Sequence, residues 1–424
     1  MFRTLARPDN IADGSFPISR QSARQIVPNP RFSAMDMQRS FIMMLMAFLH
    51  CREYTGVTYY SNIAWDRPPV WEGTSWLDML QQILISTVAA GGFFMMMGVG
   101  LIFLFHSRLK EGWSESKTCL YLVKRGLLLI FIQLTLLQCF EILAEEKIYL
   151  YVGVLIALGT NMILASLLYL FILKLKTLPA LRKYPVEYLL PASLIIIITG
   201  TLQFMISSLQ NAMVAPGIWM SALVLGGNYH HGVDIDINFT PIPWFPAVAF
   251  GMIIGQILYQ HKDKSIKILL RIALCFLLAW LLARTAFLSG WLNAGDYKLL
   301  AAADHASLAS YFCVSKYPPS IDYFLWSLGL NLLGIIMWHL AEQNVPRLMG
   351  LIQPVKIFGQ CALFFFISHW FIYYGISRFL PAPLTEPSGV ITLWLLGLML
   401  LYYLCKRYHN FKSGKPKSSI WRMF

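Results

Sequence analysis

The sequence predicts an all-α integral membrane protein, a polytopic helical bundle of about ten transmembrane helices with both termini in the cytoplasm. Three observations predict it: an apolar composition, ten apolar runs of membrane-spanning length, and a regular alternation of basic and basic-poor loops. Hydrophobic residues make up 57% and charged residues 13% of the 424 positions, and the mean hydropathy is +0.58. An average soluble domain carries about twice that share of charge. The composition therefore indicates a chain embedded in a lipid bilayer.

The spans follow from the length of the apolar runs, because a helix needs roughly 20 apolar residues to cross the hydrocarbon core. The predicted spans cover residues 38–56, 80–105, 120–140, 148–173, 188–208, 243–260, 266–288, 321–341, 357–379 and 389–405. We expect one transmembrane domain over 37–407, with basic tails over 1–36 and 408–424. The first span would be an uncleaved insertion signal, since a polar segment and no short leader precedes it.

Lysine and arginine collect in alternate loops, as expected when cytoplasmic loops retain positive charge. Of the 34 basic residues, 27 fall in the tails and in every second loop, and seven fall on the other side. This distribution predicts that both termini are cytoplasmic. It also accounts for the net charge of +13, so the lipid bilayer is an expected partner and nucleic acid is not. The sequence leaves the oligomeric state open, and a homodimer is one of the states it allows.

The first span carries polar groups at both ends. Asp36 and Arg39 stand at its cytoplasmic end, whereas His50 and Arg52 stand at its outer end. Ionisable groups are costly inside a bilayer and are functional candidates there by default. Arg39 and His50 are eleven residues apart, which places them on nearly the same helix face, roughly 16 Å apart along its axis. Anchoring of the helix end explains Asp36 and Arg39 about as well as ligand binding does.

Two histidines are the candidate catalytic imidazoles. His50 is followed by Arg52, which can orient or tune it, and histidine is the commonest general base because it titrates near neutrality. His369 lies within the ninth predicted span, at about the membrane depth expected of His50. A buried, hydrogen-bonded structural histidine is the alternative interpretation of His369.

Two further groups of residues are candidate ligand contacts. Lys124 and Arg125 open the third span at its cytoplasmic end. Such cations suit the phosphates of an anionic cosubstrate, although ordinary positive-inside residues explain them as well. Lys316 and Tyr317 precede a diproline at the start of the eighth span. Lys316 is one of few basic residues on the outer side, so it is a candidate for binding an acceptor.

The outer loops 57–79, 209–242 and 289–320 each exceed twenty residues, and loops of that length often carry function. We expect short helices there, on the membrane surface or lining a cavity.

The seven cysteines show no paired or ligand-like spacing, and the His-containing segment 228–236 fits an exposed polar loop better than a metal site. No metal is expected.

Several separated blocks of the sequence match one known family in the same order. They are Arg31, Asp36, Arg39-Ser40 and Leu49-His50-Cys51-Arg52; Phe93-Phe94 with Gly98; Lys124-Arg125-Gly126; Pro243-Trp244 with Gly251 and Gly255; Lys316-Tyr317-Pro318-Pro319-Ser320 with Leu328-Gly329; and Phe358-Gly359 through His369. In these blocks the chain resembles bacterial membrane proteins related to the catalytic domain of heparan-alpha-glucosaminide N-acetyltransferase, within a wider group of transmembrane acyltransferases. Ser40 stands where this family usually has glycine, and Leu49 stands where an acidic residue often precedes the histidine.

The resemblance implies an enzyme of the plasma (bacterial inner) membrane, a transmembrane O- or N-acyltransferase. It would pass an acyl group such as acetyl from a cytoplasmic thioester, acetyl-CoA, to a sugar hydroxyl or amine at the outer face, as in glycan modification. Asp36, Arg39, Lys124 and Arg125 would then bind the acyl-CoA donor. His50 would deprotonate the acceptor or carry the acyl group covalently. Two other functions stay open: a transporter or flippase of an envelope metabolite, and a non-catalytic relative.

Overall fold

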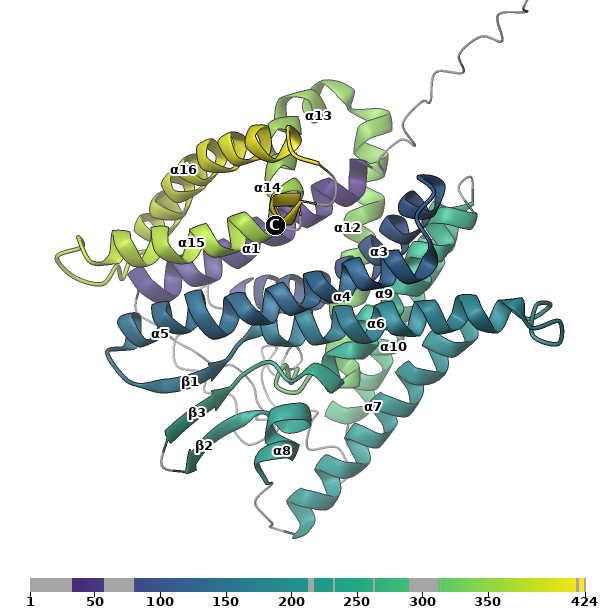
Figure 1. Cartoon of the computed structure of the whole chain (residues 1–424). Helices are drawn as coiled ribbons and strands as arrows, with labels where there is room; N and C mark the ends of the chain where they lie inside the picture. The colour runs from purple at the N-terminus through teal and green to yellow at the C-terminus, as the bar shows by residue number, and fades with distance from the viewer. Residues whose placement is uncertain are drawn as a thin grey trace, which may run out of the picture. The chain divides into compact units, whose positions relative to one another are not determined.

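Helices account for most of the structure, a computed structural model that describes residues 33–56, 80–212, 217–231, 233–261, 264–289, 312, 314–416 and 419–422 (Figure 1). The elements in chain order are α1 (Ser33–Thr55), the π-helical turn η1 (Gln81–Ile85), α3 (Ser86–Lys110), α4 (Glu115–Ile132), η2 (Gln133–Leu137), α5 (Gln138–Glu145), β1 (Tyr149–Val152), α6 (Val154–Thr177), α7 (Val186–Ala212), α8 (Ile218–Met220), η3 (Ser221–Leu225), β2 (Gly227–His231), β3 (Val233–Ile237), α9 (Pro241–Gln260), α10 (Ser265–Leu288), α12 (Ile321–Asn344), α13 (Pro346–Ile352), η5 (Gln353–Val355), α14 (Lys356–Gln360), α15 (Ala362–Ser377), α16 (Pro387–Ser413) and η6 (Ile420–Arg422). The predicted loops 57–79 and most of 289–320, like the predicted tail up to residue 32, lie outside the described residues.

Within the described ranges, eight helices are long and apolar enough to cross a membrane, and a bent pair formed by 346–360 and 362–377 is a ninth candidate. These nine coincide with the second to tenth predicted spans. The chain is therefore a polytopic helical membrane protein. The first and last long helices of the chain extend beyond residues 37–407, since α1 begins at Ser33 and α16 continues to Ser413.

The first predicted span forms α1, which is not among these nine candidates. It carries four charged residues in 23 positions, yet many of its residues are buried against other helices. Nε2 of Gln38 donates to Asn331 on α12 at 2.9 Å, and the indole of Trp338 donates back to Gln38 at 3.0 Å. On another face, the indole of Trp394 on α16 donates to the carbonyl of Met44 at 3.1 Å. Because these partners satisfy its polar groups, α1 can lie inside the bundle.

The packing of α3 against α9 depends on glycines at the crossing. A Cβ on Gly98 would clash with the backbone oxygen of Val248, and a Cβ on Gly251 would clash with that of Met95. Gly255 lies against Ile102 in the same interface. Glycine allows the two backbones to approach this closely, as is common between membrane helices.

A small sheet departs from the predicted all-α fold. Its strand order is β1-β3-β2, with β1 parallel and β2 antiparallel to β3 (Figure 1). The predicted start of the fourth span at residue 148 was wrong, because Tyr149–Val152 is a strand and α6 begins only at Val154. The outer loop 209–242 does contain short helices, α8 and η3, but its segment from Gly227 to Ile237 forms the strands β2 and β3. The backbone groups on the free edge of β1 bond to the side chain of Gln138 on α5. This amide donates to the carbonyl of Tyr149 at 2.6 Å and accepts from the amide of Tyr151 at 2.9 Å.

The ninth predicted span is broken. The structure turns by 88° between 346–360 and 362–377, so a continuous helix over 357–379 was a wrong prediction. The break lies where α14 contacts α1: the amide of Gly359 donates to Oγ of Ser40 at 2.9 Å, and this hydroxyl donates to the carbonyl of Asp36 at 2.9 Å. Ser40 thus joins the bent pair to the first helix.

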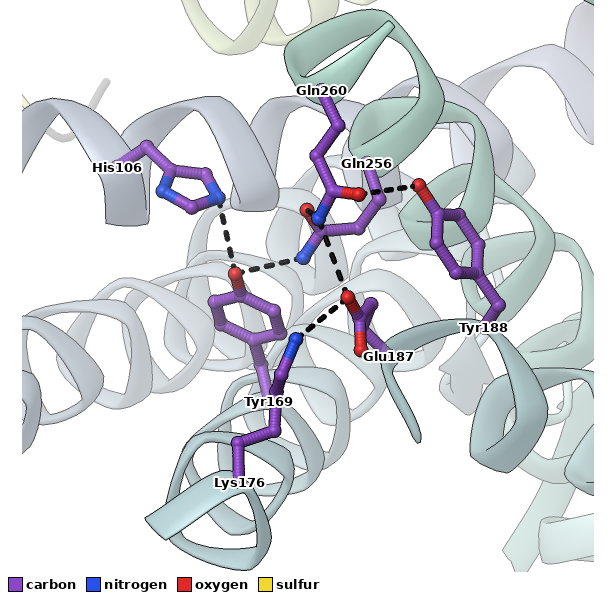
Figure 2. Close-up of polar contacts among 7 residues, drawn as sticks. All are labelled: His106, Tyr169, Lys176, Glu187, Tyr188, Gln256 and Gln260. Atoms are coloured by element: carbon purple, nitrogen blue, oxygen red, sulfur yellow. Dashed lines mark hydrogen bonds and ion pairs between the residues drawn. The ribbon is translucent and has the colours of Figure 1, made fainter. Parts of the chain in front are cut away.

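Polar side chains join α3, α6 and α9 at the end of the bundle that is predicted to be cytoplasmic. Figure 2 shows the hydroxyl of Tyr169 between His106 and Gln256. Nε2 of Gln256 donates to this hydroxyl at 2.8 Å, and Nε2 of His106 lies 3.1 Å from it. His106 also stacks on Tyr259, with ring centroids 3.7 Å apart.

The same network continues to α7. Nζ of Lys176 on α6 and Nε2 of Gln260 on α9 both lie near Oε1 of Glu187, at 2.7 and 3.4 Å. The hydroxyl of Tyr188 donates to Gln260 at 2.9 Å (Figure 2). Buried polar groups bonded in this way link α7, whose apolar span is mostly exposed, to the rest of the bundle.

We predict that Gly251→Ala destabilises the protein, because the added methyl group must push α3 and α9 apart. Gly200→Ala is the matched control, since a Cβ at Gly200 meets no atom within 4 Å. Thermal unfolding in detergent should show a Tm lowered by several degrees for Gly251→Ala, as overpacking costs roughly 1–3 kcal/mol. Gly200→Ala should keep or slightly raise the Tm because alanine favours helix. An equal Tm for both variants would contradict the close-packing interpretation.

Candidate active site

Two histidines from distant parts of the chain meet near one end of α1. Nδ1 of His50 lies 2.6 Å from Nε2 of His369 on α15, a pair separated by 319 residues in the sequence. The two rings are stacked, with centroids 4.9 Å apart and an interplanar angle of 26°. His369 is fully buried, whereas His50 is partly exposed. The structure thus brings together the two histidines that the sequence singled out as catalytic candidates.

The hydrogen bonds assign the protons of the neutral pair. Nδ1 of His369 lies 3.2 Å from the carbonyl oxygen of Phe365, and a carbonyl oxygen can only accept. Nδ1 of His369 therefore carries a proton, and in the neutral ring its Nε2 accepts. It follows that Nδ1 of His50 donates to His369 and that Nε2 of His50 holds a lone pair. This is the tautomer that a general base or nucleophile requires.

Aromatic rings cover one side of the histidine pair. The ring of Trp370 on α15 lies 4.7 Å from that of His50. Tyr54 and Phe140 pack on Trp370, with centroids 6.0 and 5.5 Å away. Phe140 belongs to α5, so three helices contribute to this wall. Nε1 of Trp370 is buried and has no hydrogen-bond partner among the described residues.

The loop before α12 brings a cation to the same place. Nζ of Lys316 lies 4.9 Å from the ring centroid of Tyr317 and 5.8 Å from that of Phe239. Lys316 is close enough for its charge to act on His50. Burial lowers the pKa of Lys316 to about 8, and the nearby carboxylate of Glu53 opposes this shift. Burial also raises the pKa of the Tyr317 hydroxyl. Lys316, one of the two predicted acceptor contacts, thus lies near His50, and Tyr317 packs beside Lys316.

A buried ion pair supports that loop. Nη1 of Arg284 on α10 lies 3.3 Å from Oδ2 of Asp322 on α12, and both side chains are fully enclosed. Asp322 also bonds to the hydroxyl of Ser320, which donates to the carbonyl of Ser315 at 3.2 Å. The hydroxyl of Ser315 in turn donates to the carbonyl of Pro318 at 3.2 Å. These bonds fix both ends of the segment that carries Lys316.

Carboxylates from α1, α5 and β3 lie near one another beside the sheet. Tyr149 on β1 donates to Oε2 of Glu141 on α5 at 3.0 Å. Glu53 and Asp236 are both close enough for their charges to act on Glu141. Burial, together with the Glu141 carboxylate, raises the pKa of Tyr149. Glu53 acts on Lys316 as well, so the surroundings of Lys316 include a carboxylate in addition to the aromatic rings.

Arg52, the third predicted catalytic residue, points to another helix. It follows His50 by two positions, which turns its side chain about 200° around the axis of α1. Its Nη1 donates to Oε1 of Gln81 at 2.5 Å, where the π-helical turn η1 leads into α3. The contact supports a role in holding α1 against the start of the second long helix.

Two of the predicted donor-binding residues, Asp36 and Arg39, lie together at the other end of α1. Nη1 of Arg39 lies 3.6 Å from Oδ1 of Asp36, one helical turn away. Arg39 also packs against α3 at Gly100. Arg125 on α4 is close enough for its charge to interact with that of Arg39, and its Nε is buried without a hydrogen-bond partner among the described residues. Lys124 is exposed, since adjacent helix positions point about 100° apart. The Arg39 and Arg125 guanidinium groups therefore lie within range of each other's charge, whereas Lys124 lies on an exposed face of α4.

Sequence reasoning missed Trp370, Glu141 and the buried pair formed by Arg284 and Asp322. Trp370 directly follows His369, and Glu141 closes an apolar run, so each had a weak signal. Arg284 carried the clearest one, because an arginine within an apolar span needs a partner. The described residues contain no group of three or more potential metal ligands.

The chain matches no model of a known protein family and no curated protein. The resemblance to the acetyltransferase family therefore rests on the sequence blocks given above.

We predict that Lys316 reacts with amine-directed acylating reagents at unusually low pH. Because a lysine reacts only when deprotonated, labelling should rise with a midpoint near pH 8 and not near the ordinary value of about 10.4. Glu53→Gln should lower this midpoint further, since the carboxylate stabilises the ammonium form. Mass spectrometry of the Lys316 peptide across pH 6–11 measures both midpoints. A wild-type midpoint above pH 10 would show that Lys316 is well solvated.

Proposed function

We propose that this protein is a transmembrane acyltransferase of the plasma membrane. It passes an acyl group from a cytoplasmic thioester such as acetyl-CoA to a sugar hydroxyl or amine on the outer side. In this proposal α1 is a tenth span, both termini are cytoplasmic, and the end of α1 that carries His50 faces outward. A helix of 23 residues is about 34 Å long and reaches across a bilayer core.

One observation carries the proposal: α1 has an imidazole with a free lone pair near one end and, near the other, an arginine that lies within charge-interaction range of Arg125 on α4. Arg39 and His50 share a face of one unbroken helix, roughly 16 Å apart along its axis. Guanidinium groups favour phosphates, and the unpartnered Nε of Arg125 suits an anionic oxygen. A long thioester with its phosphates at this end could extend its acyl group toward His50.

The tautomer of His50 supports two chemical routes. In the first, Nε2 takes the proton of the acceptor while the acceptor attacks the carbonyl carbon, and the proton then passes to the leaving thiolate. In the second, Nε2 attacks the carbonyl itself and the thiolate leaves, while the Nδ1 proton moves to His369 so that the acylimidazole is neutral. The acceptor then displaces the imidazole, the proton returns to Nδ1, and the acceptor proton balances the departed thiolate.

A transporter or flippase is the second candidate, and the break at Cys361 favours it. Discontinuous helices often form the binding sites of transporters, and α14 and α15 meet at 88° beside α1. Uptake by proteoliposomes of a radiolabelled sugar, without any acyl transfer, would support this reading. A non-catalytic relative would show neither activity, and binding of acetyl-CoA without turnover would identify it.

We predict that His50→Ala abolishes acyl transfer. The assay uses purified protein, acetyl-CoA and glucosamine, a probe that offers both hydroxyl groups and an amine, with mass spectrometry of the acetylated sugar. Loss of the base or nucleophile should reduce turnover by at least about 10²-fold. His261→Ala is the control, because His261 is exposed and lies at the end of α9. Equal turnover of wild type and His50→Ala would remove His50 from the mechanism.

We predict that Arg125→Met weakens donor binding whereas Lys124→Met does not. Loss of a charge-assisted bond to a phosphate costs about 1.5–3 kcal/mol, so the Kd for acetyl-CoA should rise roughly tenfold or more. Calorimetry in detergent measures both variants, and the neighbouring exposed lysine controls for the loss of one positive charge. A similar Kd for the two variants would argue against a phosphate at Arg125.

A further inference from the structure

An indole N–H without an acceptor lies in the wall of the site. Trp370 is 7% exposed, and its Nε1 has no hydrogen-bond partner among the described residues. Its ring is 4.7 Å from that of His50 and is held by Tyr54 and Phe140. A buried donor without an acceptor is destabilising, and native proteins keep few of them. One beside a reactive imidazole therefore suggests a functional role.

The helical setting leaves the amides next to the two histidines unable to stabilise an oxyanion. Acyl transfer passes through a tetrahedral state whose carbonyl oxygen becomes negative, and enzymes place hydrogen-bond donors where that charge develops. His50 and His369 both lie within helices, α1 and α15. Backbone amides inside a helix are already bonded to carbonyl groups one turn earlier. A side-chain donor can supply the bond that these amides do not.

We propose that Trp370 is a further catalytic residue, which donates a hydrogen bond from Nε1 to the carbonyl oxygen of the acyl group as it is transferred. This inference rests on the proposed acyltransferase function and applies to both of its routes. The nucleophile, either the acceptor or Nε2 of His50, forms a bond to the carbonyl carbon, and the π electrons move to oxygen. The indole N–H stabilises that oxyanion. The electrons then re-form the carbonyl and the carbon–sulfur bond breaks, its pair leaving on the thiolate, which the acceptor proton neutralises.

A second buried indole supplies a matched control. Nε1 of Trp244 also has no hydrogen-bond partner among the described residues, and Trp244 is fully buried. Its ring packs on Phe94 at 4.6 Å and on Tyr323 at 5.6 Å, in the interface of α3, α9 and α12. Replacing Trp244 therefore removes an equivalent N–H without touching the ring contacts of His50.

The experiment compares Trp370→Phe, Trp244→Phe, and a protein with 3-benzothienylalanine at position 370, in which sulfur replaces the indole N–H at almost constant shape. Initial rates with acetyl-CoA and glucosamine give kcat and KM, and thermal unfolding checks that each variant is folded. We expect both replacements at position 370 to lower kcat roughly 100-fold, as loss of one oxyanion donor does. The KM for acetyl-CoA should stay within about threefold, because the bond forms mainly in the transition state. Trp244→Phe should stay within about twofold in kcat.

Three outcomes overturn the proposal. Unchanged kcat in both variants at position 370 excludes an oxyanion donor there. If kcat falls in Trp370→Phe but not in the protein with 3-benzothienylalanine at position 370, the ring of Trp370 has a packing role. If kcat falls equally in Trp244→Phe, the loss of a buried indole acts through the fold. Absence of transfer by the folded wild-type protein overturns the proposed function itself, which separates that failure from the failure of this inference.

Discussion

The structure depends on one constraint: the polar side chains of α1 that are shielded from water need hydrogen-bond partners, because lipid and apolar side chains offer none. Gln38 bonds to α12, Ser40 to α14 and His50 to α15. Three helices from the last quarter of the chain are thereby positioned against the first helix. An apolar α1 of the same length would have no such preference for register or partner. The same bonds that satisfy α1 also build the candidate site, so stability and function share these contacts.

The histidine pair also explains how His50 can be oriented without an acidic neighbour. In the family that the sequence resembles, an acidic residue often precedes the histidine, and here Leu49 occupies that position. His369 provides an acceptor for Nδ1 of His50 and is itself held by a backbone carbonyl. A neutral imidazole in this role avoids burying a carboxylate, which is costly in an apolar interior. The bend at Cys361 belongs to the same arrangement, because it brings both Gly359 and His369 against α1.

The part of the candidate site around Lys316 is assembled from several elements. The loop with Lys316 is fixed by Arg284 and Asp322, a fully buried pair that joins α10 to α12. The strand β1 adds Tyr149 next to Glu141, and β1 itself is held by pairing with β3. Breaking one partner of a buried ion pair leaves a charge without compensation. The position of Lys316 is therefore tied to the packing of α10 against α12.

The sequence by itself determined the apolar helices, most of their limits and the polar ends of α1. These features follow from local composition and from the helical period of 3.6 residues, which places Arg39 and His50 on the same face of a single helix. Only the tertiary structure decided that His50 meets His369, that Arg125 and not Lys124 approaches Arg39, that residues 149–152 form a strand, and that the ninth span bends. Each of these depends on a partner far away in the chain, and a local sequence pattern contains no information about which distant groups will meet.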